Sequence, residues 1–132
     1  MDSDKKTGSD FPKAHKIAKR TEILRIQQGG KKIYTPNLLL IYSLNRNTPT
    51  RLAITISKKV DKRAVKRNLF KRRVREIFRQ YHKFLRSGFD IVVIARKDSA
   101  ELPYSDLKKD LLWGWKKAEL LDSSYLQENK QE

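Results

Sequence analysis

The amino-acid sequence predicts an α+β fold in which helices pack on a small, mostly antiparallel sheet. Three observations lead to this prediction. Short apolar runs of strand type occupy residues 38–44, 52–56 and 90–95. Segments with helical periodicity precede, separate and follow these runs. Another apolar run, at residues 33–34, is too short to define a strand by itself, so the expected order of elements is α-β-β-(β)-α-β-α.

The first element is expected to be a short helix over about residues 21–28. Ile23 and Ile26 recur there at helical spacing. Gly29-Gly30, which follows, is too short for a phosphate-binding glycine loop and is interpreted as the stop of this helix.

The strands differ in how their apolar residues are arranged. Residues 38–44 are apolar on both faces until Ser43, whereas residues 52–56 alternate in the manner of a half-buried strand. Residues 45–50 are interpreted as the hairpin turn that joins these two strands. The β-branched run at 90–95 is typical of a central strand.

Two helices are expected in the second half of the chain. A long basic helix runs from about residue 62 to 85 and stops at Ser87-Gly88. Pro103 is suitably placed to begin the last helix. The apolar stripe of that last helix contains Leu107, Leu111, Trp115 and Ala118. Trp115 is expected in the core and Trp113 partly exposed.

The charge of the chain indicates a polyanionic partner. The sequence has 31 Lys and Arg residues against 15 Asp and Glu, a net charge of +16, and residues 58–79 alone carry +9. Nucleic acid is favoured over an anionic membrane, because no apolar run is long enough to span a bilayer. The polar opening residues 1–9 carry no secretory signal, and the absence of cysteine excludes disulfides, so a cytoplasmic location is expected.

The long basic helix has two distinct faces. Its apolar residues recur at i, i+4, i+7, i+11 and i+15, which is one stripe of a helix. These residues are Phe70, Val74, Ile77, Tyr81 and Leu85. Another face carries Arg67, Asn68, Lys71, Arg72, Arg75 and Arg79. Because guanidinium groups bind phosphate bidentately and keep their charge, this face is expected to bind RNA or DNA.

The sequence nominates no protein active site. His15 and His82 are far apart in the chain and are not expected to form an acid–base pair, and His82 is interpreted as a polar residue near a helix end. The acidic residues show no paired metal-ligand spacing. We therefore expect no catalytic residue, no metal site and no small-molecule substrate in the protein.

The segment 54–79 resembles the signature of the bacterial ribonuclease P protein component. In that family a strand ending Ser-Lys-Lys is followed by a basic helix of pattern R-N-x-x-K-R-x-x-R-E. The matching residues here are Ser57-Lys58-Lys59, Arg67-Asn68, Lys71-Arg72 and Arg75-Glu76. The likeness covers about residues 11–121, which are expected to form a single RNA-binding domain between disordered tails at 1–10 and 122–132.

The resemblance implies a fold and a function. The fold would contain an uncommon left-handed β-α-β crossover. The protein would bind a large catalytic RNA, which holds the catalytic Mg²⁺ ions, and together they would remove the 5′ leader from precursor tRNA. The residues implied at the RNA subunit are Lys66, Arg67, Asn68, Lys71, Arg72, Arg75 and Arg79. Those implied at the leader, in a cleft between the first helix and the sheet, are Ile23, Tyr34, Tyr42, Lys58 and Lys59.

Two other functions are compatible with a basic helix of this kind. The chain could be a structural RNA-binding protein, for instance a ribosomal one, or a nuclease that acts without RNA. Processing of precursor tRNA with and without an RNA subunit separates these alternatives from the first.

Overall fold

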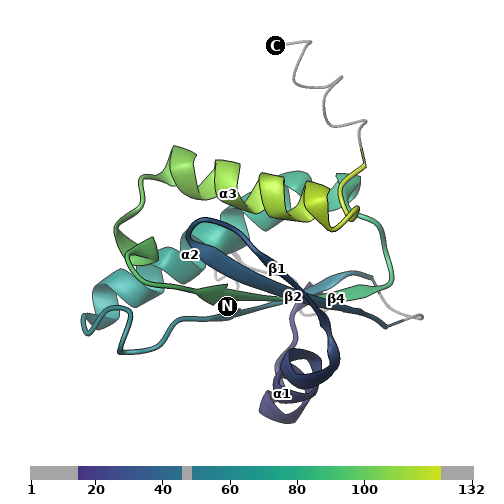
Figure 1. The fold of residues 1–132 in the computed structure, drawn as a ribbon, viewed down its shortest axis with the longest axis horizontal. Coiled ribbons are helices and arrows are strands. Elements are labelled where there is room, and N and C mark those ends of the chain that lie inside the picture. Colours follow the sequence, from purple (N-terminus) through teal and green to yellow (C-terminus); the bar gives the residue numbers. More distant parts are fainter. Residues whose placement is uncertain (1–14, 46–48, 123–132) are drawn as a thin grey trace, which may run out of the picture.

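The computed structural model describes residues 15–45 and 49–122 (Figure 1). The regular elements in these ranges are α1 (Arg20–Gly29), β1 (Lys31–Tyr34), β2 (Leu38–Leu44), β3 (Arg51–Thr55), α2 (Ala64–Tyr81), η3 (His82–Phe84), β4 (Phe89–Ala95), η4 (Ser99–Glu101) and α3 (Tyr104–Lys117). The predicted order of elements is confirmed. It includes the short strand β1, which the sequence alone could not define. The predicted tail at 1–10, and that at 122–132 apart from Asp122, lie outside the described residues.

The four strands form one mixed sheet in the order β1-β2-β4-β3. β1 pairs with β2 and β2 with β4 in antiparallel fashion, and β3 pairs with β4 in parallel. The predicted mostly antiparallel sheet is therefore confirmed. The parallel pair β3–β4 is joined through α2, which gives the β-α-β unit that the family resemblance implies. The hand of this crossover stays a prediction.

The predicted hairpin between β2 and β3 is wrong, because β4 lies between these two strands. β4 is buried along nearly its whole length, so both of its edges need a hydrogen-bonding neighbour. The six residues 45–50 are long enough to pass across β4 at about 4.8 Å per strand spacing. Local turn signals predicted the reversal of the chain correctly but could not show that a later strand would enter the gap.

The sheet is covered on both faces (Figure 1). α2 and α3 lie on one face, where the larger core contains Leu40, Ile91 and Val93 of the sheet. α1 lies on the other face over Ile41 and Val92. Successive strand residues thus alternate between two cores, and the apolar run of β4 serves both.

α2 is held to the sheet by the predicted stripe. Phe70, Val74, Ile77 and Tyr81 are all buried, and Phe78 joins them. In α3 the predicted Leu107, Leu111 and Trp115 are buried, whereas Trp113 is 47% exposed, as expected. Ala118 follows the end of α3 and is only partly buried.

We predict that Phe70→Ala destabilises the free protein by about 3–5 kcal/mol, because Phe70 is 2% exposed and its removal leaves a cavity under α2. This is a large part of the roughly 5–15 kcal/mol that stabilises a small domain. Thermal unfolding without RNA measures it. The matched control is Val65→Ala on the same helix, whose side chain is 78% exposed and should be nearly neutral. Unchanged melting of the Phe70 variant would contradict this role in the core.

Candidate RNA interface

The buried stripe of α2 determines which of its polar side chains face solvent. Asn68, Arg72 and Arg79 are exposed on the side opposite the core, and Lys71 and Arg75 are half-buried at the border with β3 and α1. Lys71, Arg72 and Arg75 form no hydrogen bond or ion pair with another described residue. Their charges are therefore available to a ligand.

The other predicted cations of α2 have acceptors within the protein. Arg79 Nη2 lies 3.1 Å from Glu76 Oε1. Arg67 Nη1 donates to the main-chain oxygens of Asp61 at 3.0 Å and Lys62 at 2.8 Å, just before the helix begins. These contacts neutralise part of the face or hold the preceding loop in place.

Lys66 lies on a different flank of α2 from this face. Its Nζ is 3.9 Å from Glu101 Oε1 of η4, and Arg63 contacts the same carboxylate. Arg63 also donates to Asp61, and these hydrogen bonds lower the pKa of Asp61 from 3.8 to about 2. The structure thus separates Lys66 from Arg72 and Arg75, with which the family resemblance had grouped it.

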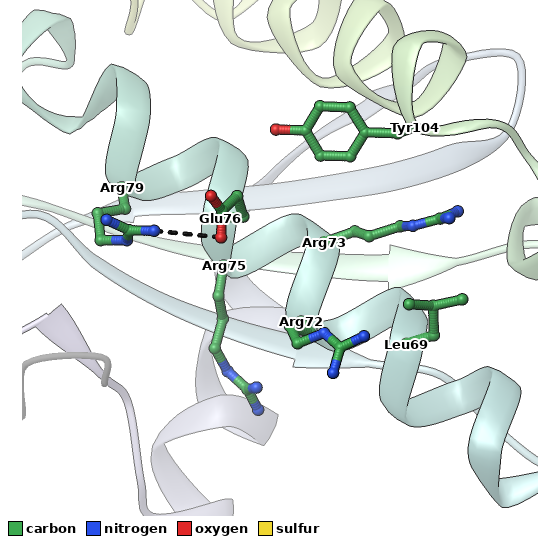
Figure 2. A pocket seen from close by; sticks show the side chains of 7 residues that line it. All are labelled: Leu69, Arg72, Arg73, Arg75, Glu76, Arg79 and Tyr104. Atoms are coloured by element: carbon green, nitrogen blue, oxygen red, sulfur yellow. Dashed lines mark ion pairs between the residues drawn. The ribbon is translucent and has the colours of Figure 1, made fainter. Parts of the chain in front are cut away.

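A groove runs between α2 and the start of α3 (Figure 2). Its volume is about 490 Å³. It is lined by Leu69, Arg72, Arg73, Arg75, Glu76, Arg79 and Tyr104. Figure 2 shows the ion pair of Arg79 with Glu76 on one side and Arg75 extending away from Tyr104. Cations beside an aromatic ring and a leucine suit a nucleic acid backbone with an accessible base.

Four residues of this groove lie outside the predicted binding face: Leu69, Arg73, Glu76 and Tyr104. Tyr104 comes from α3, and only the tertiary fold brings it to α2. Leu69 and Arg73 lie next to predicted residues but outside the face that helical spacing defines. Arg73 Nη1 also donates to the main-chain oxygen of Leu102 at 3.1 Å, which ties α2 to the segment before α3.

The exposed end of the sheet carries several of the predicted leader residues. Tyr34 is opposite Leu39 in the register, Leu39 opposite Ile94, and Ile94 opposite Thr55. Residues in register share a face, so these four side chains form a row on the α1 side of the sheet. We call it the sheet-end row. Its members are half-buried or exposed, because α1 covers the adjacent row of sheet residues and leaves this row less covered.

Lys58 and Lys59 follow β3, the strand that contributes Thr55 to this row. Both are exposed in the turn that follows the strand, as the sequence predicted. Tyr34 is 59% exposed at the other end of the row. The structure therefore brings the predicted tyrosine and lysines to one end of the sheet.

Ile23, a predicted leader residue, lies next to the basic helix α2. It lines a cavity of about 270 Å³ between α1, β3 and α2, which Lys71 and Arg75 also line. The half-buried side chain thus lies beside two cations of α2.

Tyr42 is not brought together with these residues. It packs half-buried against the larger core on the α2 and α3 side of the sheet, with its ring centroid 6.3 Å from that of Phe89. The cleft beside α1 lies on the opposite face. The geometry assigns Tyr42 a packing role, and it lends no support to contact with a leader.

The two histidines are close in space, which the sequence did not predict. The rings of His15 and His82 have centroids 4.0 Å apart, and His15 Nδ1 lies 3.3 Å from the main-chain oxygen of Thr50. Burial, together with the nearby His15, lowers the pKa of His82. Both rings pack near Phe78, so they complete the aromatic end of α2.

Within the part of the chain that the structure describes, no group of three or more His, Cys, Asp or Glu side chains is placed to hold a metal ion. No helix in residues 15–45 and 49–122 is long and apolar enough to cross a membrane.

Fold and site together define a small α+β domain that presents a cationic helix to a nucleic acid. The family model described as Ribonuclease P matches residues 11–119. The ribonuclease P protein component of Geobacter sp. (strain M21) is 39% identical over 105 residues, which cover 80% of this chain and 89% of the relative. That of Bacillus cereus is 34% identical over 83% of this chain and 92% of the relative.

Solved structures agree with these relatives. The Staphylococcus aureus RNase P protein is similar with a TM-score of 0.76 and 29% identity, over 83% of this chain and all of the other. The Thermotoga maritima RNase P protein gives a TM-score of 0.67 and 33% identity, over 74% and 91% of the two chains. The chain belongs to the ribonuclease P protein family. Its function is that of the protein subunit of a ribonucleoprotein endoribonuclease that processes tRNA 5′ ends.

Proposed function

We propose that α2 docks this subunit on the catalytic RNA and that the sheet-end row with Lys58 and Lys59 guides the 5′ leader of precursor tRNA. The observation that carries the first part is the arrangement of α2. One side of the helix is buried in the core, and Lys71, Arg72 and Arg75 on the other side have no protein acceptor among the described residues. Such fixed, unpaired cations bind phosphates without first breaking internal ion pairs.

The leader path is supported by the position of the lysines. Lys58 and Lys59 follow a strand of the sheet and precede the loop that leads to α2. A leader bound there would lie close to the RNA docked on α2. Lysines between two polyanionic strands reduce the repulsion between them, so they favour the substrate that still has a leader.

The Mg²⁺ ions of the reaction are proposed to be held by the RNA subunit. Mg²⁺ prefers oxygen ligands and is commonly bound through phosphates. The exposed side of α2 offers cations, which repel a divalent metal ion, whereas the RNA docked on it offers phosphate oxygens. The chain's own contribution is then to bind and orient the RNAs.

We predict that cleavage of precursor tRNA requires both the RNA subunit and Mg²⁺, because the protein binds and positions RNA without supplying the reacting groups. The measurement compares purified protein, RNA subunit and their complex, each with and without Mg²⁺. Cleavage by the protein alone would instead indicate a protein nuclease. Binding without any effect on processing would indicate a structural RNA-binding protein.

We predict that Arg72→Ala plus Arg75→Ala weakens binding to the RNA subunit and reduces its salt dependence. Each neutralised phosphate contributes about −0.7 to −0.9 to the slope of log K against log salt concentration, so two lost contacts should make the slope shallower by roughly 1.4–1.8. Binding is measured across a salt series, and circular dichroism should stay unchanged.

The matched control for these arginines is Arg86→Ala plus Lys116→Ala. It removes the same charge from exposed positions outside the groove on α2. If the control pair changes the slope as much as Arg72 and Arg75 do, the effect is one of net charge and α2 is not the docking face.

We predict that Lys58→Ala plus Lys59→Ala reduces the preference of the assembled enzyme for precursor over mature tRNA. The loss should be about 1 kcal/mol or more, which is at least roughly fivefold in affinity, for each lost contact. Affinity for the RNA subunit should change little. Arg86→Ala plus Lys116→Ala is again the control, since Arg86 lies near Thr50 at the opposite end of β3. An undiminished preference for precursor tRNA would exclude these lysines from the leader site.

A further inference from the structure

A second concave surface lies at the β1 edge of the sheet, away from the cationic groove on α2. It has a volume of about 620 Å³ and is formed by the end of β1, the turn after it and α3. It is lined by Tyr34, Thr35, Pro36, Lys109, Asp110 and Trp113. We call it the Tyr34–Trp113 platform.

Two aromatic rings are exposed on this platform. Tyr34 is 59% exposed and Trp113 is 47% exposed, although rings of this size are usually buried in a domain's core. Each carries a cation near its face. Arg96 Cζ lies 5.3 Å from the centroid of Tyr34, and Lys117 Nζ lies 5.6 Å from that of Trp113. Lys109 also lines the platform, which thus combines stacking surfaces with positive charge.

The platform is held rigidly by contacts beneath it. Thr35 Oγ1 donates to Asp110 Oδ2 at 2.6 Å, and the main-chain N–H of Asn37 donates to the same oxygen at 3.1 Å. A Cβ atom at Gly114 would lie 2.3 Å from Leu40 Cδ1, so glycine allows α3 to approach β2 closely. The segment after Tyr34 and the helix that carries Trp113 are therefore held together before any ligand binds, which reduces the entropy lost on binding.

The platform is continuous with the proposed leader path. Tyr34 ends the sheet-end row, which crosses three strand spacings, or about 14 Å, from Thr55. Arg96 and Lys97 follow β4 at the same end of the sheet, between the two lysines and Tyr34. A strand of RNA that passes Lys58 and Lys59 can thus reach the platform along exposed and cationic residues.

We propose that the part of the 5′ leader farthest from the cleavage site stacks its unpaired bases on Tyr34 and Trp113, with its phosphates at Arg96, Lys109 and Lys117. Single-stranded RNA is bound by aromatic rings interspersed with cations, since every base has a face to stack. The carboxylate of Asp110 is buried and turned towards Thr35 and Asn37, so it does not repel phosphate at the surface. Asp106, one turn earlier on α3, is the exposed acid nearest in sequence to Lys109. The proposal rests on the leader path stated under Proposed function.

The test uses the assembled enzyme and two precursor tRNAs, with leaders of about 4 and about 16 nucleotides, which span the usual range of single-strand site sizes. Trp113→Ala should weaken binding of the long-leader precursor by at least about fivefold, the lower end of what one stacked base contributes. The short-leader precursor should bind as it does to the unaltered enzyme. Trp113→Phe, which keeps a ring, should restore most of the loss.

Fluorescence gives a second readout on the same protein. The chain has two tryptophans, and Trp115 is 0% exposed, so an RNA that stacks on the platform should quench Trp113 alone. The long leader should quench the emission and the short one should not. The control is Leu44→Ala, which removes a 57% exposed apolar side chain from the other end of β2 and should alter neither leader's affinity.

The outcomes separate this inference from the leader path on which it rests. If Lys58→Ala plus Lys59→Ala weakens both precursors while Trp113→Ala weakens neither, the path stands and the platform is overturned. An equal loss for both leaders in Trp113→Ala also overturns it, because the effect would not depend on the distant nucleotides. Loss of self-association in Trp113→Ala, with leader affinity unchanged, would assign the platform to a second copy of the chain instead.

Discussion

The burial of one side of α2 is the constraint on which the rest of the structure depends. Helix-stabilising features are scarce at the start of this helix. Arg63 at the N-cap makes no side-chain capping hydrogen bond, and the first turn contains no acid. Lys62, Arg63 and Lys66 lie near the positive end of the helix dipole, which is unfavourable. A helix with this sequence therefore forms because Phe70 and the buried residues that follow it pack on the sheet.

A partly buried ion pair joins the two parallel strands that flank α2 in the chain. Arg51 Nε and Nη2 each donate to a carboxylate oxygen of Asp90 at 2.8 Å, and the two residues are partners in the β3–β4 register. Asn45 Nδ2 donates to the same carboxylate at 2.8 Å, from the segment that crosses from β2 to β3. Hydrogen bonding to Asp90, with its charge, raises the pKa of Arg51 despite partial burial. The pair and Asn45 thus tie the residue after β2 and the first residue of β3 to β4, and the chain leads from β3 into α2.

The sequence predicted what depends on local periodicity and could not predict what depends on distant partners. Spacing alone identified the buried side of α2 and the exposure of Trp113, because helical geometry follows from neighbouring residues. The position of β4 between β2 and β3 could not be predicted in this way, since Asp90 gives no sign in the sequence that it will contact both Arg51 and Asn45. The same limit explains Tyr42. Strand alternation shows that Tyr42 points to the opposite face from its neighbours in the chain, but only the packing of the helices decides which face carries the larger core.

The cations of the basic segment fall into two groups, those bound to acceptors within the protein and those left unpaired among the described residues. Arg63, Arg67 and Arg73 bind carboxylates or main-chain oxygens around the ends of α2 and α3. These contacts hold the helix in place but leave fewer donors for phosphate. Lys71 and Arg72, which have no such acceptor among the described residues, retain their full capacity. Counting basic residues in the sequence therefore overstates the number of phosphates that this surface can neutralise. If α2 docks on the catalytic RNA as proposed, the unpaired cations would bind its phosphates, and the paired ones would hold the helix that carries them in place.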